Sequence, residues 1–146
     1  MNYEHTQKSK LFLFAILSVI ILFSFILIES KFEPFLFLFM GVILFIIISF
    51  ISLTVIINEK YLKIKFGYGI FKKKFLLSEI KKVKAVRNHW YFGWGIRVWF
   101  WPYMRIYNVS GFDAVEIRMF DGKIYRIGTD EPKQLEEALL KVITKS

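Results

Sequence analysis

Residues 11–28 read LFLFAILSVIILFSFILI, and residues 35–57 read FLFLFMGVILFIIISFISLTVII. Neither stretch contains a charged side chain, a histidine, an asparagine or a glutamine. A helix of about 20 apolar residues crosses a bilayer core, and in lipid only helices and closed barrels satisfy the backbone. Both stretches are therefore predicted to be transmembrane helices, and the rest of the chain is interpreted around them.

The first stretch also has features of a signal peptide, because Lys8 and Lys10 precede it. However, residues 29–34 contain no small-residue cleavage site, and the second stretch follows at once. We therefore expect a retained helical hairpin. The linker 29–34 holds two Glu and one Lys, whereas lysines are frequent on both outer flanks. This distribution predicts cytoplasmic N- and C-termini at the inner cell membrane. The absence of ionisable residues in the spans argues against a transporter or channel.

Composition limits the chemistry that the chain can perform. It has 146 residues, of which 55% are hydrophobic, and most of the excess lies in the two apolar stretches. It has no cysteine, so disulfides and cysteine-based zinc sites are excluded, and it has only two histidines, His5 and His89. The net charge is +9. In a membrane protein, such a basic excess favours contact with anionic headgroups.

The remainder, residues 58–146, shows strand patterns followed by one helix pattern. Residues 61–66 alternate apolar and lysine side chains, and Asp121-Gly122 is a strong hairpin signal. From Pro132 onward, the apolar residues repeat with a helical period. The predicted strands are residues 61–66, 70–77, 78–86, 96–100, 104–109, 114–120 and 123–127.

These patterns predict an α+β membrane protein of two parts. Residues 1–57 form an N-terminal tail and a transmembrane hairpin, with helices at 11–28 and 35–57. Residues 58–146 form a cytoplasmic domain of about seven antiparallel strands in a bent sheet. A C-terminal amphipathic helix closes the open end of such a sheet economically.

Several segments carry a resemblance to a known family. They are NEKYLKI at 58–64, FLLSEIKKV at 75–83, GWGIR at 93–97, and the stretch 114–132 with its DGK turn and RIGTDEP ending. Together with the two spans they resemble the bacterial PH-like domains of small membrane proteins, most of which have no assigned biochemistry. The resemblance implies a fold and a membrane location. Phosphoinositide-binding PH domains carry basic residues around the turn between their first two strands. Here that turn is only Gly67-Tyr68-Gly69, so this basic pattern is absent.

Basic and aromatic residues concentrate in one region. Residues 58–105 carry a net charge of +10, and residues 90–107 contain nine aromatic side chains, including all four tryptophans. Aromatic rings of this kind occupy membrane interfaces or partner-binding hot spots, although half of a strand's side chains also point into a core. The candidate lipid- or partner-binding residues are Lys72, Lys73, Lys74, Lys81, Lys82, Arg87, Trp90, Trp94, Arg97, Trp99, Trp101 and Arg105.

The sequence contains no catalytic triad pattern, phosphate-binding glycine loop or metal-ligand spacing. We therefore expect a protein that is not an enzyme and that uses no cofactor or metal. The expected partners are anionic membrane lipids or a membrane protein; neither nucleic acid nor a small-molecule substrate is indicated. The predicted function is a PH-like binding domain held at the inner membrane face. The alternatives are a protective membrane protein resembling bacteriocin-immunity proteins, and an accessory subunit of a larger membrane complex.

Overall fold

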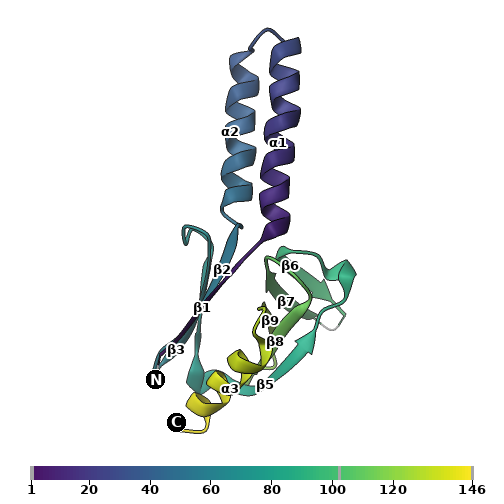
Figure 1. Cartoon of the computed structure of the whole chain (residues 1–146). Coiled ribbons are helices and arrows are strands. Elements are labelled where there is room, and N and C mark those ends of the chain that lie inside the picture. Colours follow the sequence, from purple (N-terminus) through teal and green to yellow (C-terminus); the bar gives the residue numbers. More distant parts are fainter. Residues whose placement is uncertain (1, 102, 146) are drawn as a thin grey trace.

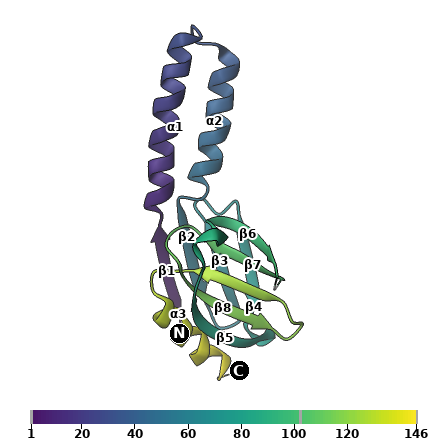
Figure 2. The same cartoon turned by 90° about the vertical axis from the view of Figure 1, so that its right-hand side faces the viewer.

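The computed structural model describes residues 2–101 and 103–145 and shows an α+β fold. Two helices run side by side away from a domain made of two β-sheets, and a third helix lies at the opposite end of that domain (Figures 1 and 2). The helices are α1 (Lys10–Glu29), α2 (Pro34–Ile48) and α3 (Pro132–Ile143), with short 3-10 turns η1 (Leu77–Glu79) and η2 (Trp90–Phe92). The strands are β1 (Tyr3–Lys8), β2 (Ser52–Ile57), β3 (Tyr61–Phe66), β4 (Lys72–Leu76), β5 (Ile80–Arg87), β6 (Gly95–Phe100), β7 (Tyr103–Asn108), β8 (Asp113–Met119) and β9 (Ile124–Gly128).

Helix α1 confirms the first predicted helix and is slightly longer than expected. Its 20 residues extend over about 30 Å at about 1.5 Å per residue. Within the described residues it is the one helix long and apolar enough to cross a membrane. Its side chains are apolar on every side and mostly exposed, and the few contacts with α2 include the Phe23–Phe39 ring pair, with centroids 6.0 Å apart. A helix of this kind needs an apolar environment around it.

The second predicted helix, residues 35–57, is wrong in its last third. Helix α2 ends at Ile48, and residues 52–57 form strand β2. Leu53, Val55 and Ile57 of this strand point into the core, and on its other face Thr54 is buried while Ile56 is half-buried. The strand continues the apolar stretch of α2 without a charged residue, and periodicity alone does not distinguish a short apolar strand from a helix segment.

The N-terminal tail forms part of a sheet, which the sequence did not predict. Strand β1 pairs with β2 in an antiparallel ladder that extends from Tyr3↔Ile57 to Lys8↔Ser52. Its sequence, YEHTQK, lacks the apolar alternation of a strand. The ladder continues through the Ser9 N–H, which donates to the Ile51 carbonyl at 2.8 Å. The helical hairpin is therefore the connection between two neighbouring strands, and the first sheet includes residues that lie before residue 58.

All seven predicted strands are present, but the described residues form nine strands in two sheets. The first sheet has the order β1-β2-β3-β4 and the second the order β5-β8-β9-β7-β6. The predicted turn at Asp121-Gly122 is confirmed as the connection between β8 and β9. The expectation of purely antiparallel strands is wrong at one position, because β7 and β9 are parallel. These strands are distant in sequence, so no turn signal marks their pairing.

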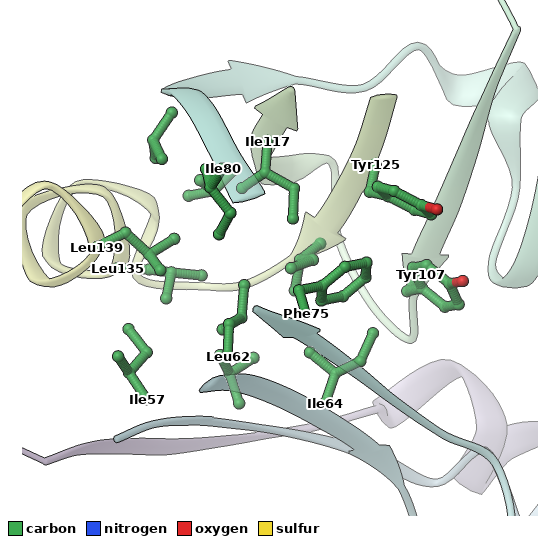
Figure 3. Packing of buried hydrophobic residues seen from close by; sticks show 14 of the residues in the cluster. Ile57, Leu62, Ile64, Phe75, Ile80, Tyr107, Ile117, Tyr125, Leu135 and Leu139 are labelled. Carbon is green, nitrogen blue, oxygen red and sulfur yellow. The ribbon is translucent and has the colours of Figure 1, made fainter. Parts of the chain in front are cut away.

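The two sheets face each other across one hydrophobic core, and α3 covers one side of it (Figure 3). Leu62 and Ile64 extend from the first sheet toward Ile117 and Tyr125 of the second. The predicted apolar stripe of α3 is confirmed in its centre, where Leu135, Ala138 and Leu139 are buried, while Val142 and Ile143 pack at its edge. The helix therefore completes the core rather than lying on the surface.

Polar contacts connect β1 to the start of α3. The His5 ring lies 2.5 Å from an Asp130 carboxylate oxygen and 3.4 Å from an oxygen of Glu131. Burial and then the negative charges of Glu131 and Asp130 raise the pKa of the Tyr3 phenol to about 12. Gln7 donates to the Ser110 carbonyl at 3.1 Å. Side-chain contacts therefore hold β1 against the second sheet and the start of α3, in addition to its backbone ladder with β2.

Replacing Leu139 by Ala is expected to lower the free energy of unfolding by about 2–5 kcal/mol, because the side chain is fully buried and its removal leaves a cavity. Leu140→Ala is the matched control, since Leu140 is exposed on the same helix. Its effect should stay within about 0.5 kcal/mol. Denaturant unfolding of the full chain in detergent micelles measures both values. Equal effects of the two substitutions would contradict the docking of α3.

Candidate functional site

The turn between β3 and β4 lies against the end of α2. Gly67 has a φ of +46°, and a Cβ atom there would lie 2.7 Å from the Ser49 carbonyl oxygen. Only glycine fits such a close approach in this conformation. Four residues further on, the ring of Phe71 stacks on that of Phe50, with centroids 5.0 Å apart. The turn therefore has a fixed position beside the base of the helical hairpin.

A cleft of about 220 Å³ opens beside this turn, between β4 and the β6–β7 hairpin. We call it the helix-proximal cleft. Its lining consists of Ile64, Phe66, Ile70, Phe71, Lys72, Lys73, Ile96 and Tyr107. Lys72 is exposed and Lys73 is half-buried, and neither has an ion-pair partner among the described residues. An apolar cleft with unpaired lysines suits a ligand that is both apolar and anionic.

The β6–β7 hairpin extends the apolar lining of the cleft. Cross-strand pairing places Ile96, Val98 and Phe100 opposite Tyr107, Arg105 and Tyr103, so these six side chains share one face of the sheet. The first sheet does not cover the outer part of this face, where Phe100 and Tyr103 are exposed. Hydrogen bonds that the Arg105 guanidinium donates to the oxygens of Tyr103 and then Tyr107 raise its pKa, and Arg105 is the cation of this face.

The other face of the hairpin forms a small core of its own. Phe92 is buried there with Met104 and Ile106, and its ring lies 4.8 Å from that of Trp99. In contrast, Trp90 is 76% exposed and Trp101 is 90% exposed. Among the aromatic residues of this region, Phe92 and Tyr107 are therefore buried, Trp94 and Trp99 are half-buried, and Trp90 and Trp101 face solvent.

The structure brings only part of the predicted site residues together. Lys72 and Lys73 line the helix-proximal cleft, whereas Lys74 lies over the Tyr61 ring at 5.6 Å. Arg87 and Trp90 border a separate, open hollow of about 450 Å³. In both views β6 lies at the end of the second sheet nearest the helices, and β5 begins at the far end (Figures 1 and 2).

Four other predicted residues have mainly local or separate roles. Trp94 donates to the Gly111 carbonyl at 3.2 Å, and Arg97 donates to the Trp94 carbonyl at 3.0 Å. These bonds hold the segment that enters β6. Lys81 and Lys82 line a hollow on the second sheet, away from the cleft. The predicted basic and aromatic set is therefore divided among several surfaces.

Sequence reasoning missed the apolar members of the cleft. Ile70 and Ile96 are exposed and contribute to its wall. A signal was present at β6, where Ile96, Val98 and Phe100 alternate with Arg97 and Trp99. Large side chains on both faces of an edge strand indicate that one apolar face remains uncovered. The described residues contain no group of three His, Asp or Glu side chains positioned to hold a metal ion.

Comparisons with models of protein families, with curated proteins and with solved structures found nothing that matches the chain.

Phe92→Ala is expected to lower the free energy of unfolding by about 3–5 kcal/mol, because the ring is the centre of the small core on the hairpin. Trp101→Ala should change it by less than about 0.5 kcal/mol, because that side chain is almost fully exposed. Thermal or denaturant unfolding of the full chain compares the two. A large loss from Trp101→Ala would show that this tryptophan is structural and unavailable for binding.

Proposed function

We propose that this protein is a membrane-anchored binding protein. In this proposal α1 and α2 cross the cell membrane as a hairpin and both termini are cytoplasmic. The two-sheet domain, of PH-like type, lies at the inner membrane face and binds anionic lipid through the helix-proximal cleft and the exposed face of the β6–β7 hairpin. The main observation in support of the proposal is the β1–β2 ladder, because β1 lies directly before the helical hairpin in the chain and β2 directly after it.

The ladder supports an even number of membrane crossings. Lys8 and Ser52 are paired neighbours in one sheet, so the chain between them must leave and return on the same side of a bilayer. Helix α1 alone would place them on opposite sides, and α2 supplies the return. Its 15 residues extend over only about 22 Å, which is less than the bilayer core of about 30 Å. Local thinning of the bilayer and the apolar residues at both ends of α2 accommodate such a mismatch.

The chemistry beside the helix bases supports lipid as the ligand. The turn after β3 exposes Tyr68, Ile70 and Phe71 next to the end of α2, and Lys72 and Lys73 follow directly. Apolar and aromatic side chains favour the interface, and each lysine near an anionic surface contributes roughly 1 kcal/mol. Helix α3 covers the core at the end of the domain away from α1 and α2, and this single C-terminal helix is the feature that supports a PH-like arrangement.

The membrane orientation is testable by cysteine labelling, because the chain has no cysteine of its own. We expect Ser30→Cys, in the linker between α1 and α2, to react with an impermeant maleimide in intact cells. Lys145→Cys should react only after the cells are opened, since the C-terminus is cytoplasmic in this proposal. The unsubstituted chain is the control for background labelling. The reverse pattern, or equal labelling of both sites in intact cells, would refute the proposed orientation.

Lipid binding is testable with the full chain in nanodiscs. We expect tryptophan emission to shift to shorter wavelengths when phosphatidylglycerol is added to phosphatidylcholine discs, because the domain then settles on the surface. The double substitution Lys72→Gln and Lys73→Gln should weaken the association of the domain with the anionic surface by up to about 2 kcal/mol and so reduce the emission shift. Lys133→Gln with Lys141→Gln on α3 removes the same charge far from the helices and should have little effect (Figure 1). Identical spectra in both lipids would contradict the proposal.

A further inference from the structure

A second cationic cluster lies on the outer face of the second sheet and has no part in the proposed lipid site. It consists of Lys82 and Lys84 on β5, Arg118 on β8 and Arg126 on β9, arranged around Glu116. These side chains line a hollow of about 240 Å³. Their strands are neighbours in the order β5-β8-β9, so the cluster lies on paired strands at the β5 edge of the sheet rather than on a loop.

Glu116 holds both arginines in place. One of its carboxylate oxygens accepts from the Arg118 Nε at 2.9 Å, and the other accepts from the Arg126 Nε at 3.0 Å and lies 3.0 Å from the Arg126 Nη2 in an ion pair. Burial alone would raise the pKa of Glu116, but the bonds from the two arginines lower it overall. The carboxylate is therefore charged, and it orients both guanidinium groups, of which Arg126 is also held by Asn88.

The cluster nevertheless contains more positive charge than Glu116 neutralises. The hollow is lined by four cations and one carboxylate, which leaves a net charge of +3. Lys82 lies directly opposite Arg118 in the ladder, and like charges in that position repel each other. Among the described residues, Lys82 and Lys84 have no ion-pair partner, and the terminal nitrogens of Arg118 have no hydrogen-bond acceptor.

Donors also exceed acceptors at the edge of the cluster. The Nη1 of Arg126 donates to the side-chain oxygen of Asn88 at 3.2 Å. The amide nitrogen of that Asn88 is buried and has no hydrogen-bond partner within the described residues. Buried donors in folded proteins are normally satisfied by protein, water or a ligand. Asn88 lines the neighbouring open hollow with Arg87 and Trp90, so this unsatisfied donor lies beside the cation cluster and not within its hollow.

A second hollow of about 350 Å³ adjoins the first and shares Lys82 and Arg118 with it. Its remaining wall includes the apolar residues Phe120 and Ile124. Phe120 is one of the exposed large hydrophobic residues of the domain. A ligand that places an anionic group on the shared cations can therefore extend an apolar part over this wall.

We propose that this cluster is a binding site for a phosphate monoester, with Arg118, Lys82 and Lys84 contacting the phosphate oxygens and Arg126 supporting them. A guanidinium fixed at its Nε presents its terminal nitrogens in the geometry that suits phosphate. The phosphate group belongs to a soluble ester or to a lipid headgroup of phosphatidic acid. The position of β5 and β8 toward the end of the domain opposite α1 and α2 favours the soluble source (Figures 1 and 2).

The test uses the full chain in zwitterionic micelles and isothermal titration calorimetry with phenyl phosphate and inorganic phosphate at constant ionic strength. We expect phenyl phosphate to bind more tightly than inorganic phosphate, because its ring covers the apolar wall. Arg118→Gln should weaken binding by about tenfold or more, since it removes charge-assisted bonds. Glu116 keeps Arg126 in that variant, so the fold is retained. Lys63→Gln on β3 is the matched control and should change affinity less than twofold.

A parallel arm compares nanodiscs with and without phosphatidic acid. Binding of phenyl phosphate that is lost in Arg118→Gln supports a site for soluble esters. Phosphatidic acid dependence that is lost in Arg118→Gln, without binding of the soluble esters, supports the phosphate site and assigns it to a lipid. The proposal is overturned if the wild-type chain binds neither probe, or if Arg118→Gln and Lys63→Gln reduce binding equally. Neither arm depends on Lys72 or Lys73, so the lipid-cleft proposal is tested separately.

Discussion

The pairing of β1 with β2 is the constraint on which the rest of the structure depends. Six residue pairs join two strands that are separated in sequence by the whole helical hairpin. Only one residue, Ser9, lies between β1 and α1, and its hydroxyl also caps the helix by accepting from the Phe12 N–H. Because β2 lines the core and β1 contacts the start of α3, the same ladder determines both where the helices leave the domain and how the sheets close.

The two proposed binding surfaces differ in chemistry because one lies between the two sheets and the other lies on the outer face of the second sheet. The helix-proximal cleft combines an apolar lining with lysines that have no carboxylate nearby. On the outer face of the second sheet, in contrast, a buried carboxylate orders arginines on neighbouring strands. Flexible lysines beside apolar residues suit a fluid and variable partner such as a bilayer surface, whereas ordered arginines suit a defined oxyanion. Net charge alone, the signal available in the sequence, does not separate these two situations.

Much of the architecture was predictable, because it depends on local patterns. The alternation in 61–66, the Asp121-Gly122 turn and the helical period after Pro132 all specified their elements. The failures have a common cause, which is that partners distant in sequence override local signals. Strand β1 is polar and exists because β2 pairs with it, and β2 looks helical because its sequence continues the apolar stretch of α2 without a charged residue. Likewise, the cation cluster joins residues from β5, β8 and β9, so no contiguous motif marks it.

The short strand-to-helix connection also has a consequence for the order in which the molecule is made. Strand β1 is synthesised before its partner β2, which follows only after the entire apolar hairpin. Until then β1 has no ladder, and closing so long a loop is entropically costly unless the hairpin is already compact. Insertion of the two helices would bring Ser9 and Ile51 together and remove most of that cost. Insertion of both helices would then template the sheet, so a chain in which only α1 crossed would keep β1 and β2 on opposite sides of the bilayer and leave the sheet unformed.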